Sequence, residues 1–388
     1  MINERLKRFM DNRCCTLLGV GPMSKNCVDA TIELSNDYEI PLIIIASRRQ
    51  IEAEDFGGGY VNNWSTERFA EYVIEHDQKG KIILARDHGG PWQNNFEKEQ
   101  KLSLRNAMES AKKSFQVDIE SGFEMIHIDA SVDIYSDLSI NETLLRIFDL
   151  YEFCWSIAQQ EKRKIIFEIG SEEQSGSNHN QHDVEYVISE TINFCNKNNL
   201  PKPSFVVIQT GTKVLETRNV GTFDTPFRIK GELPSEIEIP KMLDICNKYD
   251  IFLKQHNTDY LSDEALAWHP KLGIHSANVA PEFGVVETLA FIEILKEYKL
   301  TDLVEKFVKL SYESKKWEKW MSAESKAGEI EKAVIAGHYV FSDPEFIEIK
   351  LHAKTELQNH NIDLDEYLKS KVKKSIMRYL VNFRLVGR

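Results

Sequence analysis

The segment Lys81-Ile-Ile-Leu-Ala-Arg-Asp-His-Gly-Gly-Pro91 joins an apolar run to a polar, glycine-rich turn. Apolar residues at nearly every position of 81–86 are typical of a strand buried on both faces, as in a parallel sheet covered by helices. Asp87 and His88 follow where that strand would end. A carboxylate can move a proton and a neutral imidazole can bind a metal, so the segment favours metal-assisted chemistry at a strand end. A helix cap beside a solvated histidine is the alternative.

The same alternation of short apolar runs and longer stretches of helical period recurs eight times. Eight βα units in one chain predict an α/β fold of the (β/α)8 TIM barrel type. A doubly wound open sheet is the alternative, but an open sheet concentrates its site at one crevice, whereas polar residues follow many of these runs. The expected strands are residues 15–20, 41–46, 81–86, 124–129, 164–169, 204–209, 250–254 and 271–275.

The C-terminal part of the chain differs from the rest in composition and in periodicity. Residues 299–388 are rich in Lys and Glu, have helical periodicity and contain no strand-like run. We therefore predict a barrel over residues 1–298 that carries the site, and a helical extension over 299–388 packed on it. Residues 210–236 form a long connection after the sixth strand, and loops of that length are usually functional or mobile.

Bulk properties exclude several classes of function. The chain has 388 residues, 42% of them hydrophobic, and a net charge of −13. This charge argues against nucleic acid as the main partner, because phosphate backbones bind positive surfaces. No apolar stretch approaches the roughly 20 residues of a membrane span. The N-terminus has no signal-peptide pattern and the cysteines form no CxxC pair, so we expect a reduced, cytoplasmic protein that binds neither nucleic acid nor membrane.

Other polar residues follow the remaining predicted strands. His256 comes after residues 251–254, and together with His88 it predicts a metal site, although a lone histidine is more often structural. Asp129 ends the fourth strand, where it could accept a hydrogen bond that orients a metal ligand or could cap the next helix. Glu172 lies in the loop after the fifth strand, as a zinc ligand, a base or a solvated loop residue.

Small and polar residues after the seventh and eighth strands suggest a phosphate or hydroxyl site, which TIM barrels commonly build there. His275 is a substrate contact, a further metal ligand or a packing residue. The glycines of residues 57–59 supply backbone that can approach a substrate, and they match no nucleotide-binding motif. The predicted substrate- or phosphate-binding residues are Gly58, Gly59, Asn257, Thr258, Asp259, His275, Ser276 and Asn278.

Together these strand ends resemble the class II tagatose-bisphosphate aldolase family, specifically its larger Z-type subunit. The matching segments run in the family's order over most of the chain. They are Phe56-Gly-Gly-Gly-Tyr60, Asp87-His-Gly-Gly-Pro91, Ile126-His-Ile-Asp-Ala-Ser131, Ile169-Gly-Ser-Glu172, Gln255-His-Asn-Thr-Asp-Tyr260 and His338-Tyr-Val-Phe-Ser-Asp343.

The resemblance implies a (β/α)8 barrel and a divalent metal, usually Zn²⁺. It assigns Asp87 as the catalytic acid/base, and His88 and His256 as metal ligands. Glu172 would be a ligand or a base, and Asp129 a further residue of the active site. The sequence departs from the family in two respects. Class II aldolases carry another histidine ligand after strand six, and Val207-Ile-Gln-Thr-Gly-Thr-Lys213 has none; the eighth strand carries His275-Ser-Ala-Asn278 where a Val-Gly-Pro-like stretch is expected.

The leading expectation is a metal-dependent aldolase, a carbon–carbon lyase, acting on a ketose phosphate or a related sugar. A metal-dependent sugar epimerase or isomerase is the first alternative, since it needs the same metal but moves a proton without cleaving carbon. A non-catalytic subunit that stabilises a smaller aldolase is the second, because Z-type subunits are often regarded as such helpers. We expect a homo-oligomer or a hetero-complex with a smaller aldolase subunit.

Overall fold

A closed barrel of eight parallel strands forms the centre of the molecule, as the sequence predicted. The computed structural model describes residues 2–170, 181–208, 212–220, 235–322 and 324–387. The strands lie in the order β1-β10-β9-β6-β5-β4-β3-β2 around the barrel. Their bounds are β1 Leu17–Val20, β2 Leu42–Ser47, β3 Ile82–Gly89, β4 Met125–Asp129, β5 Ile166–Gly170, β6 Phe205–Val207, β9 Phe252–Gln255 and β10 Ser276–Val279.

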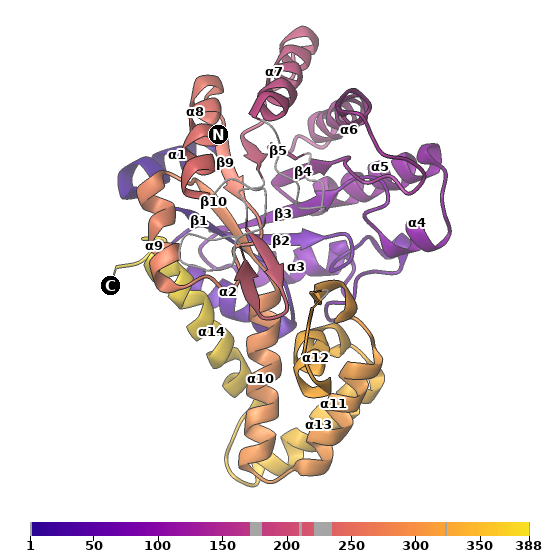
Figure 1. Cartoon of the computed structure of the whole chain (residues 1–388), viewed down its shortest axis with the longest axis vertical. Coiled ribbons are helices and arrows are strands. Elements are labelled where there is room, and N and C mark those ends of the chain that lie inside the picture. Colours follow the sequence, from indigo (N-terminus) through magenta and orange to yellow (C-terminus); the bar gives the residue numbers. More distant parts are fainter. Residues whose placement is uncertain (1, 171–180, 209–211, 221–234, 323, 388) are drawn as a thin grey trace.

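Helices surround this barrel and bury its outer face (Figure 1). Several of them begin at a serine whose side chain accepts a backbone N–H of the first turn, such as Ser24, Ser139 and Ser262. Such caps satisfy donors that the helix itself leaves free. The helices are α1 Ile2–Arg13, α2 Lys25–Tyr38, α3 Thr66–His76, α4 Asn95–Glu99, α5 Leu104–Ser121, α6 Ile140–Gln160, α7 Gln181–Asn198, α8 Ser235–Tyr249, α9 Asp263–Leu272 and α10 Pro281–Glu297.

The eighth barrel strand lies later in the chain than predicted. Residues 271–275 were expected to form it, but Lys271 and Leu272 end helix α9, and Gly273 terminates that helix with a φ of 86°. Glycine adopts this left-handed conformation without strain. The strand is β10, which begins at Ser276. The prediction was wrong because small and polar residues, Ser-Ala-Asn, carry the strand instead of the preceding apolar run.

The C-terminal helices pack on one side of the barrel. Helices α11 Thr301–Glu313, α12 Glu329–Ala336 and α13 Pro344–Gln358 share a second hydrophobic core with α10. Helix α14, Leu364–Asn382, returns toward the barrel (Figure 1) and packs against α2, α9 and α10. Its later apolar residues, including Ile376 and Tyr379, belong to the core of the barrel. The division of the chain at residue 298 stays a prediction.

The connection after β6 contains a two-stranded antiparallel hairpin, β7 Lys213–Leu215 and β8 Arg218–Val220. The backbone N–H of Glu216 donates to the carbonyl oxygen of Trp320 at 2.8 Å. Ser322 donates to the Glu216 side chain at 3.3 Å. A loop of the barrel is therefore fixed to the C-terminal extension. Within the described ranges, no helix is both long and apolar enough to cross a membrane.

Candidate metal centre

Four side chains converge inside the barrel, near the C-terminal ends of its strands. Asp87, His127, Glu168 and His256 each offer one donor atom, and these atoms all lie within 4.8 Å of one another. Strand register explains the convergence: His127 of β4 pairs with Glu168 of β5, and residues paired in this way point to the same side of a sheet. We call these four residues the donor cluster.

The separations within the donor cluster suit a metal better than hydrogen bonds. His127 Nδ1 lies 3.5 Å from both Asp87 Oδ1 and Glu168 Oε1. His256 Nε2 lies 3.7 and 3.6 Å from the same two oxygens. Normal hydrogen bonds are shorter, about 2.7–3.2 Å. Ligands bound tetrahedrally to zinc at its usual distances would be roughly 3.3–3.5 Å apart.

The chemistry of the donor cluster also fits a divalent cation. Asp87 Oδ1 and Glu168 Oε1 are buried and accept no hydrogen bond from the described residues. A buried carboxylate oxygen without a partner is costly unless a ligand satisfies it. Two imidazoles and two carboxylates form a mixed nitrogen and oxygen donor set, which suits Zn²⁺ and other first-row divalent metals.

Glu168 is held as a carboxylate by a buried lysine. Lys254 Nζ donates to Glu168 Oε2 at 2.7 Å, and both side chains are almost fully buried. Burial alone would raise the pKa of Glu168, but Lys254 and the neighbouring histidines lower it to about 2. The second oxygen, Oε1, remains directed at His127 and His256. Glu168 is thus ionised, which is the form that binds a metal.

A backbone contact orients the ring of His127. The N–H of His88 donates to His127 Nδ1 at 3.2 Å. A ring nitrogen that accepts a hydrogen bond uses its single lone pair for that bond, so Nδ1 would bind a metal only once this contact is released. His88 sits at a shift in the β3–β4 register, with a φ of 45°. The irregular end of β3 therefore brings this N–H to the donor cluster.

His88 itself lies beside the donor cluster, and Asp129 orients it. His88 Nδ1 is 2.8 Å from Asp129 Oδ2, and Asp129 also accepts from Gln93 and Ser131. Burial would raise the pKa of Asp129, but the His88 contact lowers it to about 2. His88 Nε2 is 3.9 Å from Asp87 Oδ2. An imidazole anchored through one nitrogen by a carboxylate is a common arrangement around protein-bound metals.

Asp87 is the member of the donor cluster that faces open space. It lines a cavity of about 610 Å³ together with His88, Gly58 and Gly59. Asp87 is 9% exposed, whereas Glu168 is 0% exposed. Burial would raise the pKa of Asp87, but the nearby histidines hold it well below its ordinary value. A substrate in this cavity would meet an ionised Asp87.

Three of the predicted substrate-binding residues have buried polar side chains without a hydrogen-bond partner in the described part of the chain. Thr258, Ser276 and Asn278 are at most 5% exposed, and their side-chain oxygens have no hydrogen-bond partner among the described residues. Ser276 pairs in register with Lys254, so Ser276 and Asn278 share the interior face. A Cβ atom at Gly19 would lie 2.2 Å from Asn278 Oδ1. Glycine at that position therefore makes room for the amide.

The other predicted residues are placed elsewhere. Asn257 lies at the end of β9 with a φ of 58°, and Asn219 bonds its carbonyl oxygen. Asp259 Oδ1 accepts the N–H groups of Ala280 and Glu282, which places it at the start of α10. Burial and the nearby Glu282 carboxylate raise the pKa of Asp259 to about 7.

His275 does not join the donor cluster. His275 precedes β10 and therefore lies at the opposite end of the barrel, where its Nδ1 accepts the N–H of Leu253. Burial and the nearby Lys7 lower the pKa of His275 to about 4. Glu172 lies outside the described residues.

Comparison with known proteins identifies the family. Residues 3–195 match the family model described as "D-tagatose-1,6-bisphosphate aldolase subunit GatZ/KbaZ-like". The chain belongs to the GatZ/KbaZ-like family. No curated protein matches the sequence.

Solved structures share the fold of this GatZ/KbaZ-like chain. A probable tagatose 6 phosphate kinase from Sinorhizobium meliloti 1021 has a TM-score of 0.72 at 15% identity, over 95% of this chain and 100% of that chain. A fructuronate-tagaturonate epimerase from Cohnella laeviribosi has a TM-score of 0.56 at 12% identity, over 96% of this chain and 81% of that chain. A fructose-bisphosphate aldolase from Campylobacter jejuni has a TM-score of 0.55 at 12% identity, over 99% of this chain and 94% of that chain. At these identities the likeness concerns the fold alone.

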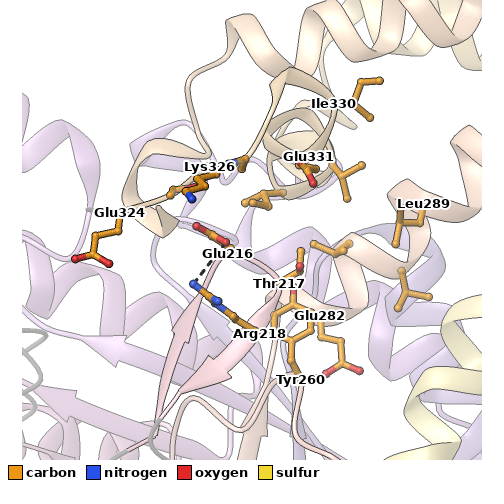
Figure 2. A pocket seen from close by; sticks show the side chains of 16 residues that line it. Glu216, Thr217, Arg218, Tyr260, Glu282, Leu289, Glu324, Lys326, Ile330 and Glu331 are labelled. Carbon is orange, nitrogen blue, oxygen red and sulfur yellow. Dashed lines mark hydrogen bonds and ion pairs between the residues drawn. The ribbon is translucent and has the colours of Figure 1, made fainter. Parts of the chain in front are cut away.

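A larger cavity, of about 820 Å³, lies between the β7–β8 hairpin, α10 and the C-terminal extension. Figure 2 shows polar side chains that line it, including Glu216, Arg218 and Glu331, and apolar ones such as Leu289 and Ile330. Its described lining includes no member of the donor cluster. The larger of the two cavities in this GatZ/KbaZ-like protein is therefore not the one that adjoins the donor cluster.

Sequence reasoning did not select His127 and Lys254, and it left the direction of Glu168 open. A signal for His127 was present, because it precedes Asp129 by two residues on one strand. Alternation then places both side chains on the same face. The inward face of β5 could not be read in this way, since the sequence does not say which of its residues turn toward the barrel axis.

Proposed function

We propose that this GatZ/KbaZ-like chain is a divalent-metal-dependent aldolase that cleaves a carbon–carbon bond of a ketose phosphate or related sugar. The observation that carries the proposal is the ionised Asp87 at the floor of a cavity, in contact with a buried set of nitrogen and oxygen donors. A divalent cation bound there would act as a Lewis acid that polarises the carbonyl group of a ketose.

His127, Glu168 and His256 would hold the cation, with His88 as a further donor through Nε2. Glu168 suits this role because it is buried, ionised and anchored by Lys254. Asp129 would keep the His88 ring in place through their 2.8 Å contact. Asp87 differs from His127, Glu168 and His256 because it lines the cavity, so we assign it to the substrate.

Asp87 would act as the base during cleavage. Its carboxylate would take the proton from the hydroxyl group on the carbon β to the carbonyl. That oxygen then becomes the carbonyl of an aldehyde fragment, and the electrons of the broken carbon–carbon bond stay with the other fragment. In the reverse direction Asp87 returns the proton. Its low pKa keeps it deprotonated at neutral pH, as a base must be.

The unpartnered side chains of Thr258, Ser276 and Asn278 would bind hydroxyl groups of the sugar. Their buried oxygens accept or donate no hydrogen bond within the described structure, so a polar ligand would satisfy them. The backbone of Gly58 and Gly59, on the wall of the cavity, would lie beside the substrate.

An epimerase remains the second candidate, and one observation favours it. The described end of β6, Phe205 to Ile208, carries no histidine, whereas the resembling aldolases have a ligand there. Product analysis separates the two activities, because an aldolase yields two fragments and an epimerase yields an isomer of the same mass. A supporting role beside a smaller aldolase would instead require a stable hetero-complex and an isolated chain without metal.

The proposal is tested with Asp87→Asn, which keeps the shape of the side chain but removes the base. Zinc-loaded wild type and variant are assayed with tagatose 1,6-bisphosphate and fructose 1,6-bisphosphate, and triose phosphate release is followed. We expect kcat to fall by about 10²–10⁴-fold, with the zinc content unchanged.

The exposed Asp137, in the loop before α6, provides a control: Asp137→Asn should keep full activity. Turnover by Asp87→Asn at the wild-type rate would refute the role of Asp87. If the wild-type protein converts these sugars only to isomers of equal mass, the activity is that of an epimerase and not of an aldolase.

A further inference from the structure

The cavity in front of Asp87 is lined by two regions that are far apart in the sequence. One wall comes from the loop after β2 and includes Arg49. The facing wall comes from residues 315–320 of the C-terminal extension and includes Lys316 and Lys319. Positive side chains therefore gather at one cavity of a protein whose net charge is −13.

These three cations lack counter-ions. Arg49, Lys316 and Lys319 form no ion pair with any residue in the described part of the chain. Arg48, their neighbour in the lining, is different because Glu52 and Glu97 neutralise it at 2.7 and 2.6 Å. One carboxylate, Glu318, lines the same cavity. The unpaired positive charge thus belongs to the open side of the cavity and not to the core.

The extension holds its lysine in a defined position. Lys319 Nζ lies 4.6 Å from the centre of the Trp320 ring and 5.0 Å from that of Tyr339. Trp320 donates to the Tyr339 hydroxyl at 3.1 Å, and its carbonyl oxygen accepts from Glu216 of the barrel hairpin. Cation–π contacts of this kind restrain an ammonium group without neutralising it.

The three cations also repel one another. Burial, together with the charges of Arg49 and Lys316, lowers the pKa of Lys319 to about 7. Like charges brought together without counter-ions destabilise each other, and an anion placed between them removes that cost. Guanidinium and ammonium groups are also the side chains that bind phosphate oxygens most strongly.

We infer that Arg49, Lys316 and Lys319 form an anion subsite for the phosphate ester of the substrate, at the mouth of the cavity that ends at Asp87. The inference rests on the proposed function for the identity of the reacting group, and it moves the phosphate away from the loops after β9 and β10. The buried polar groups there would then bind hydroxyls. The C-terminal extension contributes directly to substrate selection.

Binding of inorganic phosphate to metal-free protein tests the subsite without any use of catalysis. Isothermal titration is performed on wild type, on Lys316→Gln/Lys319→Gln, and on Lys306→Gln/Lys326→Gln as a control with the same change of charge. The control lysines belong to the same extension but do not line this cavity. We expect phosphate affinity to fall at least tenfold in the first pair and to stay within twofold in the control.

Arg49→Gln should weaken phosphate binding in the same way, and Arg49→Lys should restore part of it. Wild-type protein that does not bind phosphate, or equal losses in both lysine pairs, would overturn the subsite. If phosphate binding depends on Lys316 and Lys319 but the protein cleaves no sugar, the subsite is supported and the aldolase activity is refuted. Sugar cleavage whose KM is unchanged in Lys316→Gln/Lys319→Gln would support the aldolase activity and refute the subsite.

Discussion

Two neighbouring residues of β3 lead to two different buried charge networks. Arg86 points away from the barrel axis toward the helices, and Asp87 points inward to the donor cluster. Both networks are shielded from solvent and both combine cationic or imidazole groups with carboxylates. They differ in how completely their polar atoms are satisfied.

The outward network is closed on itself. Asp118 of α5 receives two hydrogen bonds from Arg86, at 2.7 and 2.5 Å, while Arg86 also donates to the carbonyl oxygens of Ala46 and Ile51. Arg48 bonds Glu52 and Glu97, and both carboxylates accept further hydrogen bonds. Its geometry ties β2, β3 and α5 together, so we regard it as structural.

The inward network leaves buried oxygens at 3.5–3.7 Å from their imidazole neighbours. Such distances are too long for strong hydrogen bonds and suit ligands that share a cation. Burial and charge do not by themselves mark a functional site. Incomplete hydrogen bonding among buried ionised groups is the feature that separates the donor cluster from the scaffold.

The largest effect on stability is expected in the outward network. Asp118→Asn leaves Arg86 buried without its carboxylate, so the free energy of unfolding of the metal-free protein should fall by about 3–5 kcal/mol. Asp87→Asn, the same substitution on the inward side, should cost less than about 2 kcal/mol because Asp87 Oδ1 has no hydrogen bond to lose. Urea denaturation of both metal-free variants measures the difference.

Asp137→Asn again serves as a control, since exposed substitutions usually change stability by about 0.5 kcal/mol or less. Equal losses for Asp118→Asn and Asp87→Asn would remove the distinction between the two networks, and the donor cluster would then have to be considered a second structural network.

A smaller effect is expected from an exposed network that links α2 to α14. Glu33 contacts Lys369 at 2.6 Å and Lys373 at 3.0 Å. Burial would raise the pKa of Glu33, but the two lysines lower it below its ordinary value. Glu33→Gln should cost about 0.5–1 kcal/mol at pH 7, as exposed ion pairs do.

The pH dependence of this loss has a definite sign. Because the pKa of Glu33 is lower in the folded protein, its contribution is present above the unfolded value of about 4.3 and disappears as the pH falls through the folded value. Urea denaturation of wild type and Glu33→Gln between pH 7 and acidic pH should therefore converge. A difference that grows on acidification would contradict the pairing.

The sequence predicted the barrel because each strand carries its own apolar run, which is local information. Asp87 and His88 were selected for the same reason, as they directly follow such a run. Glu168 could not be assigned, because the direction of a side chain within a fully buried strand depends on how the barrel closes. The convergence of Arg49 with Lys319 could not be predicted either, since only the packing of the extension on the barrel brings them together.

We propose that His127, Glu168 and His256 of the donor cluster hold one divalent cation. Elemental analysis of zinc-supplied, dialysed protein tests it most directly, with wild type beside His127→Ala, His256→Ala and Asp118→Asn. We predict close to one zinc ion per chain in wild type and in Asp118→Asn, and a loss of the metal in both histidine variants. Wild-type protein without metal, or His127→Ala protein that keeps it, would contradict the account.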